Sequence, residues 1–265
     1  MSRVLVSMPT YKTPDNLLRR AVESVLAQTH ADLRLVVVAD GYRIKASELP
    51  RDDRLIVHRF PENRGRYFSD AVVTALAADD EVVVIHDADD WSDPDRIERL
   101  LPVLEDGAAI ARYHRHTPRG GHHVQEPSKT RFGNPDGNFV HIGHWCSGAY
   151  TGERIRRAGG IHPGFRVGYD TLFVRMLAYT GPVGISRRPS YHWERRSGGS
   201  LTTSAETKFG SPHRLAARKE LVRLNTLAWE ARQRGDDPGQ VIRDDIPDEL
   251  AEQVEIAAAE LAEKL

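Results

Sequence analysis

The sequence contains a single cysteine, Cys146, among its 265 residues. One cysteine cannot form a disulfide within the chain, so a disulfide framework is excluded and a reducing compartment such as the cytoplasm fits best. A long apolar run is also missing, both after the N-terminal Met-Ser-Arg and later in the chain. We therefore expect a soluble cytoplasmic protein with no membrane span, which would reach a membrane only by docking on it.

An excess of one charge is missing as well. The sequence has 37 Lys and Arg residues against 38 Asp and Glu residues, which gives a formal net charge of −1. This balance predicts no broad basic surface, so nucleic acid is not expected as a partner. Hydrophobic residues make up 40% and charged residues 28%, as in ordinary globular proteins, and the length suits one α/β domain with a C-terminal addition.

Short apolar runs alternate with amphipathic stretches in the first part of the chain. Runs typical of buried strands lie at residues 4–8, 33–38, 55–57 and 82–85. Apolar residues at helical spacing predict helices at residues 14–26 and 67–78, and Pro94 predicts the start of another. The alternation predicts an α/β fold with a mixed, mostly parallel, Rossmann-like sheet flanked by helices.

Polar residues directly follow three of these predicted strands. Tyr11 comes after the first strand, Asp40 after the second, and the run Asp87-Ala88-Asp89-Asp90 after the fourth. In open sheets of this kind, ligands bind beyond the carboxyl ends of the strands. We therefore expect these three groups to line one site at the same edge of the sheet.

The rest of the chain is first irregular and then helical. Residues 115–138 are rich in His, Gly, Pro, Arg and Asn, which predicts a long loop or an irregular hairpin. Helices are predicted at residues 153–158, 169–179, 215–232 and 248–265. The last helix carries an apolar stripe that would pack on the domain or on a second subunit, so a homodimer is a hypothesis.

The acidic run is a candidate metal site. Neighbouring carboxylates repel one another, and a hard cation such as Mn²⁺ or Mg²⁺ binds one or two carboxylates together with substrate phosphates. The alternative is a solvated acidic turn that caps the next helix. The position of Asp87, Asp89 and Asp90 directly after a buried strand favours the metal site.

Short motifs follow one another in a characteristic order along the chain. They are Ser7-Met8-Pro9-Thr10-Tyr11, Val25-Leu26-Ala27-Gln28-Thr29, Val36-Val37-Val38-Ala39-Asp40-Gly41, Asn63-Arg64-Gly65, His86-Asp87-Ala88-Asp89-Asp90, Gly168-Tyr169-Asp170, and Tyr191-His192-Trp193 with Ser200-Leu201-Thr202. This series resembles glycosyltransferase family 2, whose members are inverting enzymes with the GT-A fold. The more specific motifs cover roughly the first two-thirds of the chain.

The resemblance implies a nucleotide site at the predicted sheet edge. Its residues would be Pro9, Thr10, Tyr11, Asp40, Arg66, Asp87 and Ala88. Tyr11 would stack on the base and Asp40 would accept a hydrogen bond from it, which favours UDP and leaves dTDP and GDP open. The alternatives are a half-buried aromatic side chain for Tyr11 and a turn residue for Asp40.

The resemblance also implies a catalytic centre. Asp89, Asp87 and His192 would hold Mn²⁺ or Mg²⁺ against the diphosphate. Asp170 would be the general base for the acceptor, the alternative being an acid favoured by a helix dipole. The diphosphate and acceptor would contact His144, Trp145, Tyr169, Arg195 and Arg196, with surface charge as the alternative for the two arginines.

Three departures from the family pattern bear on these roles. Paired acids after the second strand are replaced by Ala39-Asp40, and the stretch after Asn63-Arg64-Gly65 is unusual. The usual Glu-Asp pair is Tyr169-Asp170 here, which leaves one carboxylate to act as the base.

A histidine-rich stretch and the cysteine stand outside these motifs. His114, His116, His122 and His123 have a spacing compatible with zinc, but no cysteine accompanies them, and a flexible acceptor loop explains them as well. Cys146 beside Trp145 is interpreted as a small packed residue and not as a nucleophile.

The resemblance implies an inverting, metal-dependent glycosyltransferase that moves a sugar from a nucleoside-diphosphate donor to a hydroxyl acceptor. The acceptor would be a lipid-linked saccharide, a natural product or a peptide. Residues 1–110 would form the nucleotide-sugar half, 111–204 the acceptor and catalytic half, and 205–265 a helical extension. The alternatives are a sugar nucleotidyltransferase, disfavoured because residues 7–12 contain no glycine to cradle a phosphate, and a non-catalytic binding module.

Overall fold

The computed structural model describes residues 3–45, 47, 49–130, 140–142, 144–196, 206–208 and 210–265. The strands are β1 (Val4–Thr10), β2 (Leu33–Ala39), β3 (Leu55–Arg59), β4 (Val82–Ile85), β5 (Trp91–Ser92), β6 (Ala108–His116), β7 (His122–Gln125), β8 (Ser128–Thr130), β9 (Val140–Ile142), β10 (Ala149–Thr151) and β11 (Gly184–Glu194). The helices are α1 (Asp15–Leu26), α2 (Arg66–Ala75), α3 (Arg96–Leu100), α4 (Gly152–Arg157), α5 (Tyr169–Thr180), α6 (Pro212–Arg234), α7 (Pro238–Asp245) and α8 (Asp248–Ala262).

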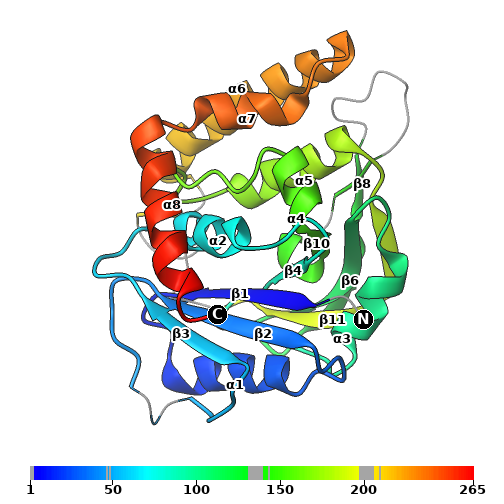
Figure 1. The fold of residues 1–265 in the computed structure, drawn as a ribbon. Helices are drawn as coiled ribbons and strands as arrows, with labels where there is room; N and C mark the ends of the chain where they lie inside the picture. The colour runs from blue at the N-terminus through cyan, green and yellow to red at the C-terminus, as the bar shows by residue number, and fades with distance from the viewer. Residues whose placement is uncertain are drawn as a thin grey trace.

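One sheet forms the centre of the molecule. Within the described ranges it has nine strands in the order β3-β2-β1-β4-β10-β6-β11-β5, with β7 paired to β6. The half made of β3, β2, β1 and β4 is entirely parallel, whereas β10 runs antiparallel to both β4 and β6. Figure 1 shows α1 on one side of the sheet and α2, α4, α5 and α8 on the other. The predicted mixed sheet flanked by helices is confirmed.

Strand β1 shows why a continuous apolar run belongs in the middle of such a sheet. Val4, Val6 and Met8 pack on the side of α1, while Leu5 packs on the side of α2. Side chains of a strand alternate between the two faces, so a strand covered by helices on both sides is apolar at most positions. The buried Ser7 of β1 is the exception, and its hydroxyl donates a hydrogen bond to Asp70. Each fully buried side chain of this size contributes roughly 1.5–3 kcal/mol to folding.

The helices agree with the predicted pattern where the apolar stripe is long. Helix α1 buries Leu18, Ala21, Val22 and Val25, which were expected on one face. The C-terminal helices lie over the α2 side of the sheet, with α8 against α2 and both α6 and α7 against α5 (Figure 1). Among the described residues, none of the helices is both long enough and apolar enough to span a lipid bilayer.

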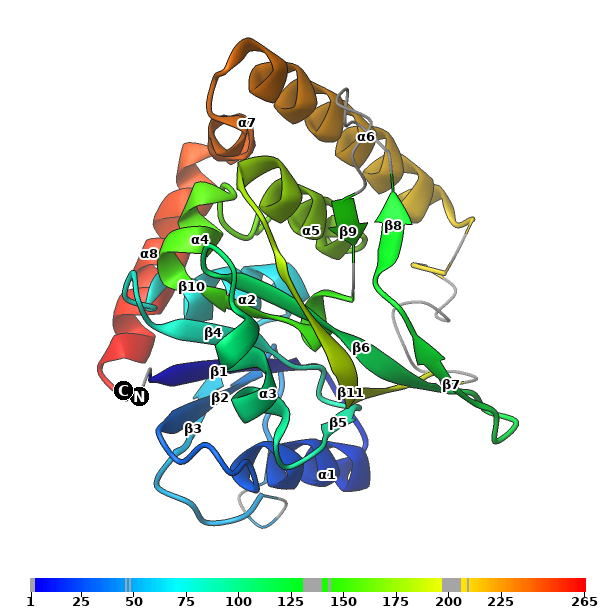
Figure 2. The ribbon, with the colours of Figure 1, turned by 90° about the vertical axis from the view of Figure 1, so that its right-hand side faces the viewer.

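The irregular stretch after residue 115 is partly a hairpin. Strand β6 continues to His116 and pairs antiparallel with β7, and the pair projects from the body beside β11 and β5 (Figure 2). The predicted "irregular hairpin" therefore applies to the first part of the stretch. Residues 131–139 lie outside the described part of the chain.

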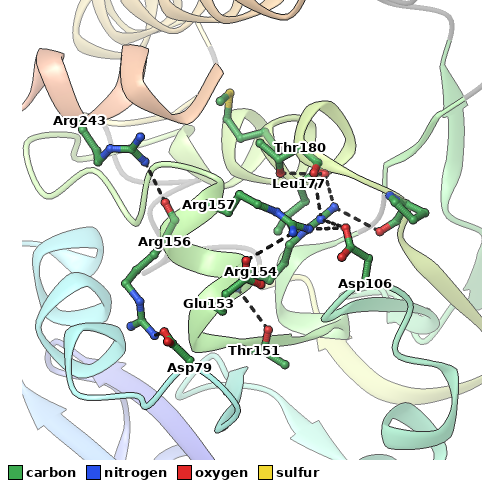
Figure 3. Close-up of polar contacts among 12 residues, drawn as sticks. Asp79, Asp106, Thr151, Glu153, Arg154, Arg156, Arg157, Leu177, Thr180 and Arg243 are labelled. Atoms are coloured by element: carbon green, nitrogen blue, oxygen red, sulfur yellow. Dashed lines mark hydrogen bonds and ion pairs between the residues drawn. The ribbon is translucent and has the colours of Figure 1, made fainter. Parts of the chain in front are cut away.

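A buried arginine, Arg154 of α4, joins several elements on the α5 side of the sheet (Figure 3). Its side chain is fully buried and forms an ion pair with Asp106 in the turn before β6. It also donates hydrogen bonds to the carbonyl oxygens of Leu177 (2.6 Å), Thr180 (3.1 Å) and Pro182 (3.2 Å). The last carbonyls of a helix have no partner within the helix, so the guanidinium caps the C-terminus of α5 and complements its dipole.

We expect Arg154→Leu to lower the free energy of unfolding by about 3–5 kcal/mol, because it leaves the carbonyls of α5 unpaired inside the protein. The matched control is Arg157→Leu. Arg157 contacts the same Asp106 but its side chain is 34% exposed, so its loss should cost no more than about 1 kcal/mol. Urea unfolding of the two variants measures the difference, and equal losses would show that Arg154 has no special role.

Candidate functional site

The strand order brings the three predicted polar groups to one edge of the sheet. Strand β1 lies between β2 and β4 and is parallel to both. Asp40 follows β2, Tyr11 follows β1, and the acidic run follows β4. These groups therefore extend beyond the carboxyl ends of three adjacent parallel strands, where α/β proteins bind ligands.

The acidic run forms a compact group of carboxylates. One oxygen from each of Asp87, Asp89 and Asp90 lies within 4.8 Å of the others. The three are not equivalent. Asp90 is buried, accepts hydrogen bonds from the Tyr191 hydroxyl and the Glu194 backbone N–H, and so fastens β11 to the run. Burial, reinforced by the charge of Asp89, raises the pKa of Asp90 well above its usual range.

Asp87 and Asp89 keep part of their surface and are each paired with an arginine. Their side chains are 17% and 22% exposed. Arg66 contacts Asp87, and Arg196 lies 2.7 Å from Asp89. The two guanidinium groups supply the positive charge that adjacent carboxylates require. Asp87 and Asp89 are therefore the members of the run that can face a ligand.

Asp170 lies at the beginning of α5 with its carboxylate partly exposed. The buried hydroxyl of Tyr67 donates to its Oδ1 atom at 2.9 Å. Burial raises the pKa of Tyr67 well above its usual range, so this hydroxyl keeps its proton and stays a donor. Tyr67 is not among the site residues that the sequence predicted. Its place one residue after Arg66 was the available signal, because both begin the helix that follows the Asn-Arg-Gly motif.

The first turn of α2 connects the acidic run to Asp170. Arg66 reaches Asp87 and Tyr67 reaches Asp170, although the two partners are far apart in the sequence. Arg66 also lies over the ring of Trp145, 4.6 Å from its centre. Two consecutive side chains thus hold both carboxylate groups of the site.

The predicted base-binding residues have different surroundings. Tyr11 is 51% exposed and meets Tyr42 edge-on at 6.3 Å between ring centres. Thr10 is buried beside them, 2.8 Å from the Tyr42 hydroxyl. Pro9 is partly exposed, whereas Ala88 is buried. Tyr42 was missed because nothing in the sequence distinguishes it from an ordinary loop residue.

Asp40 is tied to the turn that precedes α2. Its carboxylate oxygens accept the backbone N–H groups of Arg64 (2.6 Å) and Gly65 (2.8 Å), and burial raises its pKa. The next residue, Gly41, has φ +74°, and a Cβ there would come within 2.3 Å of the Asn63 nitrogen. The turn role considered for Asp40 is therefore present, and a base would have to use a remaining lone pair.

Two of the predicted acceptor residues serve as packing residues instead. Tyr169 is fully buried, and its hydroxyl donates to the Gly160 carbonyl oxygen at 2.9 Å, which leaves no surface for an acceptor. Trp145 is 3% exposed and packs against Tyr67 and Phe173. The sequence predicted that they line an acceptor pocket because Trp145 follows His144 and Tyr169 precedes Asp170.

The remaining predicted residues differ in burial and in their partners. His144 is partly buried, Arg195 is exposed, and Arg196 is paired with Asp89. His192 is outside the acidic run: its Nε2 atom lies 2.9 Å from Asp93 Oδ1. The segment Ser200-Leu201-Thr202 lies outside the described residues.

Cys146 is buried, and burial raises the pKa of its thiol to about 12, as expected of a packed thiol.

Burial lowers the pKa of His144 from 6.5 to about 4. The unfolded chain then binds more protons than the folded one between these pH values, so stability falls as pH decreases through this window. We expect His144→Phe to remove up to about 3 kcal/mol of that loss. Urea unfolding at pH 7 and pH 4.5 measures it, with His123→Phe as an exposed control. If the free energy of unfolding changed by the same amount between pH 7 and pH 4.5 in both variants, the lowered pKa of His144 would not be the cause of the loss.

Sequence comparisons identify relatives of known class. A family profile described as "Glycosyl transferase family 2" matches residues 5–177. The chain is 39% identical over 88 residues to a glucosyl-dolichyl phosphate glucuronosyltransferase of Haloferax volcanii, covering 32% of this chain and 28% of the relative. It is 31% identical over 115 residues to glycosyltransferase GlyA of Streptococcus pneumoniae, covering 41% and 16%. The aligned segment spans less than a third of either relative.

Structural comparisons find the same architecture. The chain resembles residues 1–349 of S. aureus TarS in complex with UDP-GlcNAc, with a TM-score of 0.64, 14% identity, and coverage of 100% of this chain and 81% of the other. It also resembles GalNAc-T7 with UDP, GalNAc and Mn²⁺, with a TM-score of 0.59, 14% identity, and coverage of 86% and 50%. At these identities the likeness establishes the fold.

Proposed function

The chain belongs to glycosyltransferase family 2, and we propose that it transfers a sugar from a nucleoside-diphosphate donor to a hydroxyl acceptor with inversion at the anomeric carbon. The GT-A fold expected from the motifs is confirmed by the structural likeness. One observation carries the proposal: the first turn of α2 holds Asp87 of the acidic run through Arg66 and a separate carboxylate, Asp170, through Tyr67.

The donor would lie across the carboxyl ends of β2, β1 and β4. The exposed ring of Tyr11 is suited to stacking on the base. UDP is favoured by Asp40, and two solved structures of similar fold contain UDP or UDP-GlcNAc. Arg66 and Arg196 would contact the diphosphate, because both lie at the acidic run and guanidinium groups bind phosphate oxygens well.

The residues present fit a divalent cation. Asp87 and Asp89 offer partly exposed carboxylate oxygens, the ligands that Mn²⁺ and Mg²⁺ prefer together with phosphates. When bound, such an ion would stabilise the negative charge that develops on the departing diphosphate. His192 contacts Asp93 and would not be a ligand of this ion.

Asp170 would act as the general base. Its carboxylate takes the proton of the acceptor hydroxyl while the acceptor oxygen bonds to the anomeric carbon. The bond from that carbon to the diphosphate breaks on the opposite face, and the diphosphate leaves with the electron pair. The Tyr67 hydroxyl would keep this carboxylate oriented at the N-terminus of α5.

Release of nucleoside diphosphate tests this function. The full chain is incubated with UDP-, dTDP- and GDP-sugars and Mn²⁺, alone and with hydroxyl acceptors, and the diphosphate is measured. Turnover with one nucleotide class and inverted product linkage supports the proposal. Release of pyrophosphate from a nucleoside triphosphate and a sugar phosphate would instead support the nucleotidyltransferase alternative.

Tyr67→Phe should lower kcat by about tenfold and leave the affinity for nucleoside diphosphate unchanged. The Tyr67 hydroxyl positions the Asp170 carboxylate, and the loss of a hydrogen bond to a carboxylate costs on the order of 1.5 kcal/mol, which corresponds to about a tenfold change in rate. Tyr169→Phe is the neighbouring control, since its hydroxyl bonds Gly160 and not Asp170. An unchanged kcat in Tyr67→Phe would argue against a positioned Asp170 as the base.

A further inference from the structure

Four histidines that are separated in the sequence share one face of the sheet. On β6, His114 and His116 are two residues apart and so point to the same side. His114 is paired in register with His192 of β11, and His116 with His122 of β7. His192 is in turn paired with Trp91 of β5, on whose ring it stacks at 4.8 Å. Four neighbouring strands thus contribute to one cluster beside the projecting hairpin (Figure 2).

A carboxylate completes this cluster. Asp93 follows β5, and its Oδ1 atom lies 2.9 Å from His192 Nε2. One ligand atom from each of Asp93, His114 and His192 lies within 4.8 Å of the others, and all three side chains are partly exposed. Two imidazoles and a carboxylate at this separation are the donor set of tetrahedral zinc sites that keep a fourth position open.

The other two histidines occupy the positions of supporting residues. His116 Nε2 lies 3.0 Å from His192 Nδ1, and His122 Nε2 lies 2.7 Å from His114 Nδ1. Each candidate ligand ring therefore has one nitrogen held by a second imidazole, which leaves the other nitrogen for a metal. Zinc-binding histidines are usually oriented in this way by a partner on the far ring nitrogen.

We propose that Asp93, His114 and His192 form a second metal site, selective for Zn²⁺ or a similar borderline ion and distinct from the Asp87–Asp89–Asp90 group. His116 and His122 orient its ligands. The chemistry separates the two sites, because the acidic group offers only carboxylate oxygens, whereas imidazole nitrogen favours zinc over magnesium. A bound ion would fix the β6–β7 hairpin to β11 and to the segment after β5.

Zinc titration of the full, metal-stripped chain without a histidine tag tests this site. Calorimetry should show one equivalent of Zn²⁺ bound to the wild type and to Asp89→Ala, in which the acidic group is impaired. Affinity should fall more than about 100-fold in His114→Ala and His192→Ala, and about 10–100-fold in His116→Ala, which removes only a supporting ring. Co²⁺ absorption supplies a second readout of tetrahedral ligation.

His123→Ala is the matched control. His123 is exposed on the same hairpin, and its neighbour His122 points to the cluster, so alternation directs His123 to the opposite face. It should bind Zn²⁺ like the wild type. The proposal is overturned if the wild type binds no Zn²⁺, if His192→Ala binds it unchanged, or if only Asp89→Ala loses it. Each of these results would leave the transferase proposal standing.

Discussion

Asp170→Asn is expected to lower kcat by about 10²–10⁴-fold, the range for loss of a positioned general base. The amide keeps the shape of the side chain but cannot accept the proton of an acceptor hydroxyl at neutral pH. Asp170 is partly exposed and is held by one hydroxyl, so the variant should fold normally. Its affinity for nucleoside diphosphate should remain close to that of the wild type, because Asp170 is outside the acidic group.

Asp15→Asn separates catalysis from a helix-dipole effect. Asp15 also lies in the first turn of a helix, α1, and it is exposed. If Asp170 served only the dipole of α5, the two variants would show the same small loss of stability and no loss of turnover. Equal kcat values for both variants would therefore remove Asp170 from the mechanism.

Asp89→Asn is expected to lower kcat/KM for the nucleotide-sugar donor by about 10²–10³-fold in the presence of Mn²⁺. The change removes a charge that the diphosphate-bound ion requires, and electrostatic stabilisation of a leaving group is worth several kcal/mol. It also frees Arg196 from its ion pair, which should make the residual activity less dependent on Mn²⁺. Steady-state rates over a range of Mn²⁺ concentrations measure both effects.

The control for Asp89 lies in the same segment. Asp95 is also an aspartate in an ion pair with an arginine, Arg99, but this pair belongs to α3 and its N-cap. Asp95→Asn should leave kcat/KM within about twofold, as expected of a solvent-accessible ion pair. A similar loss in both variants would indicate a general effect on the segment and not a metal ligand.

The parallel half of the sheet was predictable because its strands are buried on both faces. Runs such as residues 35–38 and 82–85 are apolar at every position, and the intervening helix α1 has its apolar residues on one face. Strand β11 was not predicted, since Arg187, Arg188 and Pro189 interrupt its pattern where its pairing with β6 shifts register. Helix α7 was missed because it has only eight, mostly polar, residues.

The sequence predicts the site residues that directly follow a strand, but it does not predict the side-chain contacts between residues that are distant in the chain. Asp40 and the acidic run follow strands, so topology alone brings them together. The contacts of Arg196 with Asp89 and of Tyr67 with Asp170 join residues more than 100 positions apart, and no local pattern reports them. His192 was grouped with Asp89 by motif, whereas strand register places it beside His114.

Isothermal titration of UDP into the protein, with and without Mn²⁺, tests the central claim most directly. The account predicts that UDP binds the wild type with Mn²⁺, much more weakly without it, and that Asp89→Ala loses the Mn²⁺-dependent part. Asp170→Asn should bind as the wild type does. Binding of UDP that is equally strong without Mn²⁺ and in Asp89→Ala would contradict a metal-assisted donor site at the acidic group. Absence of binding for UDP, dTDP and GDP alike would contradict the nucleotide-sugar transferase itself.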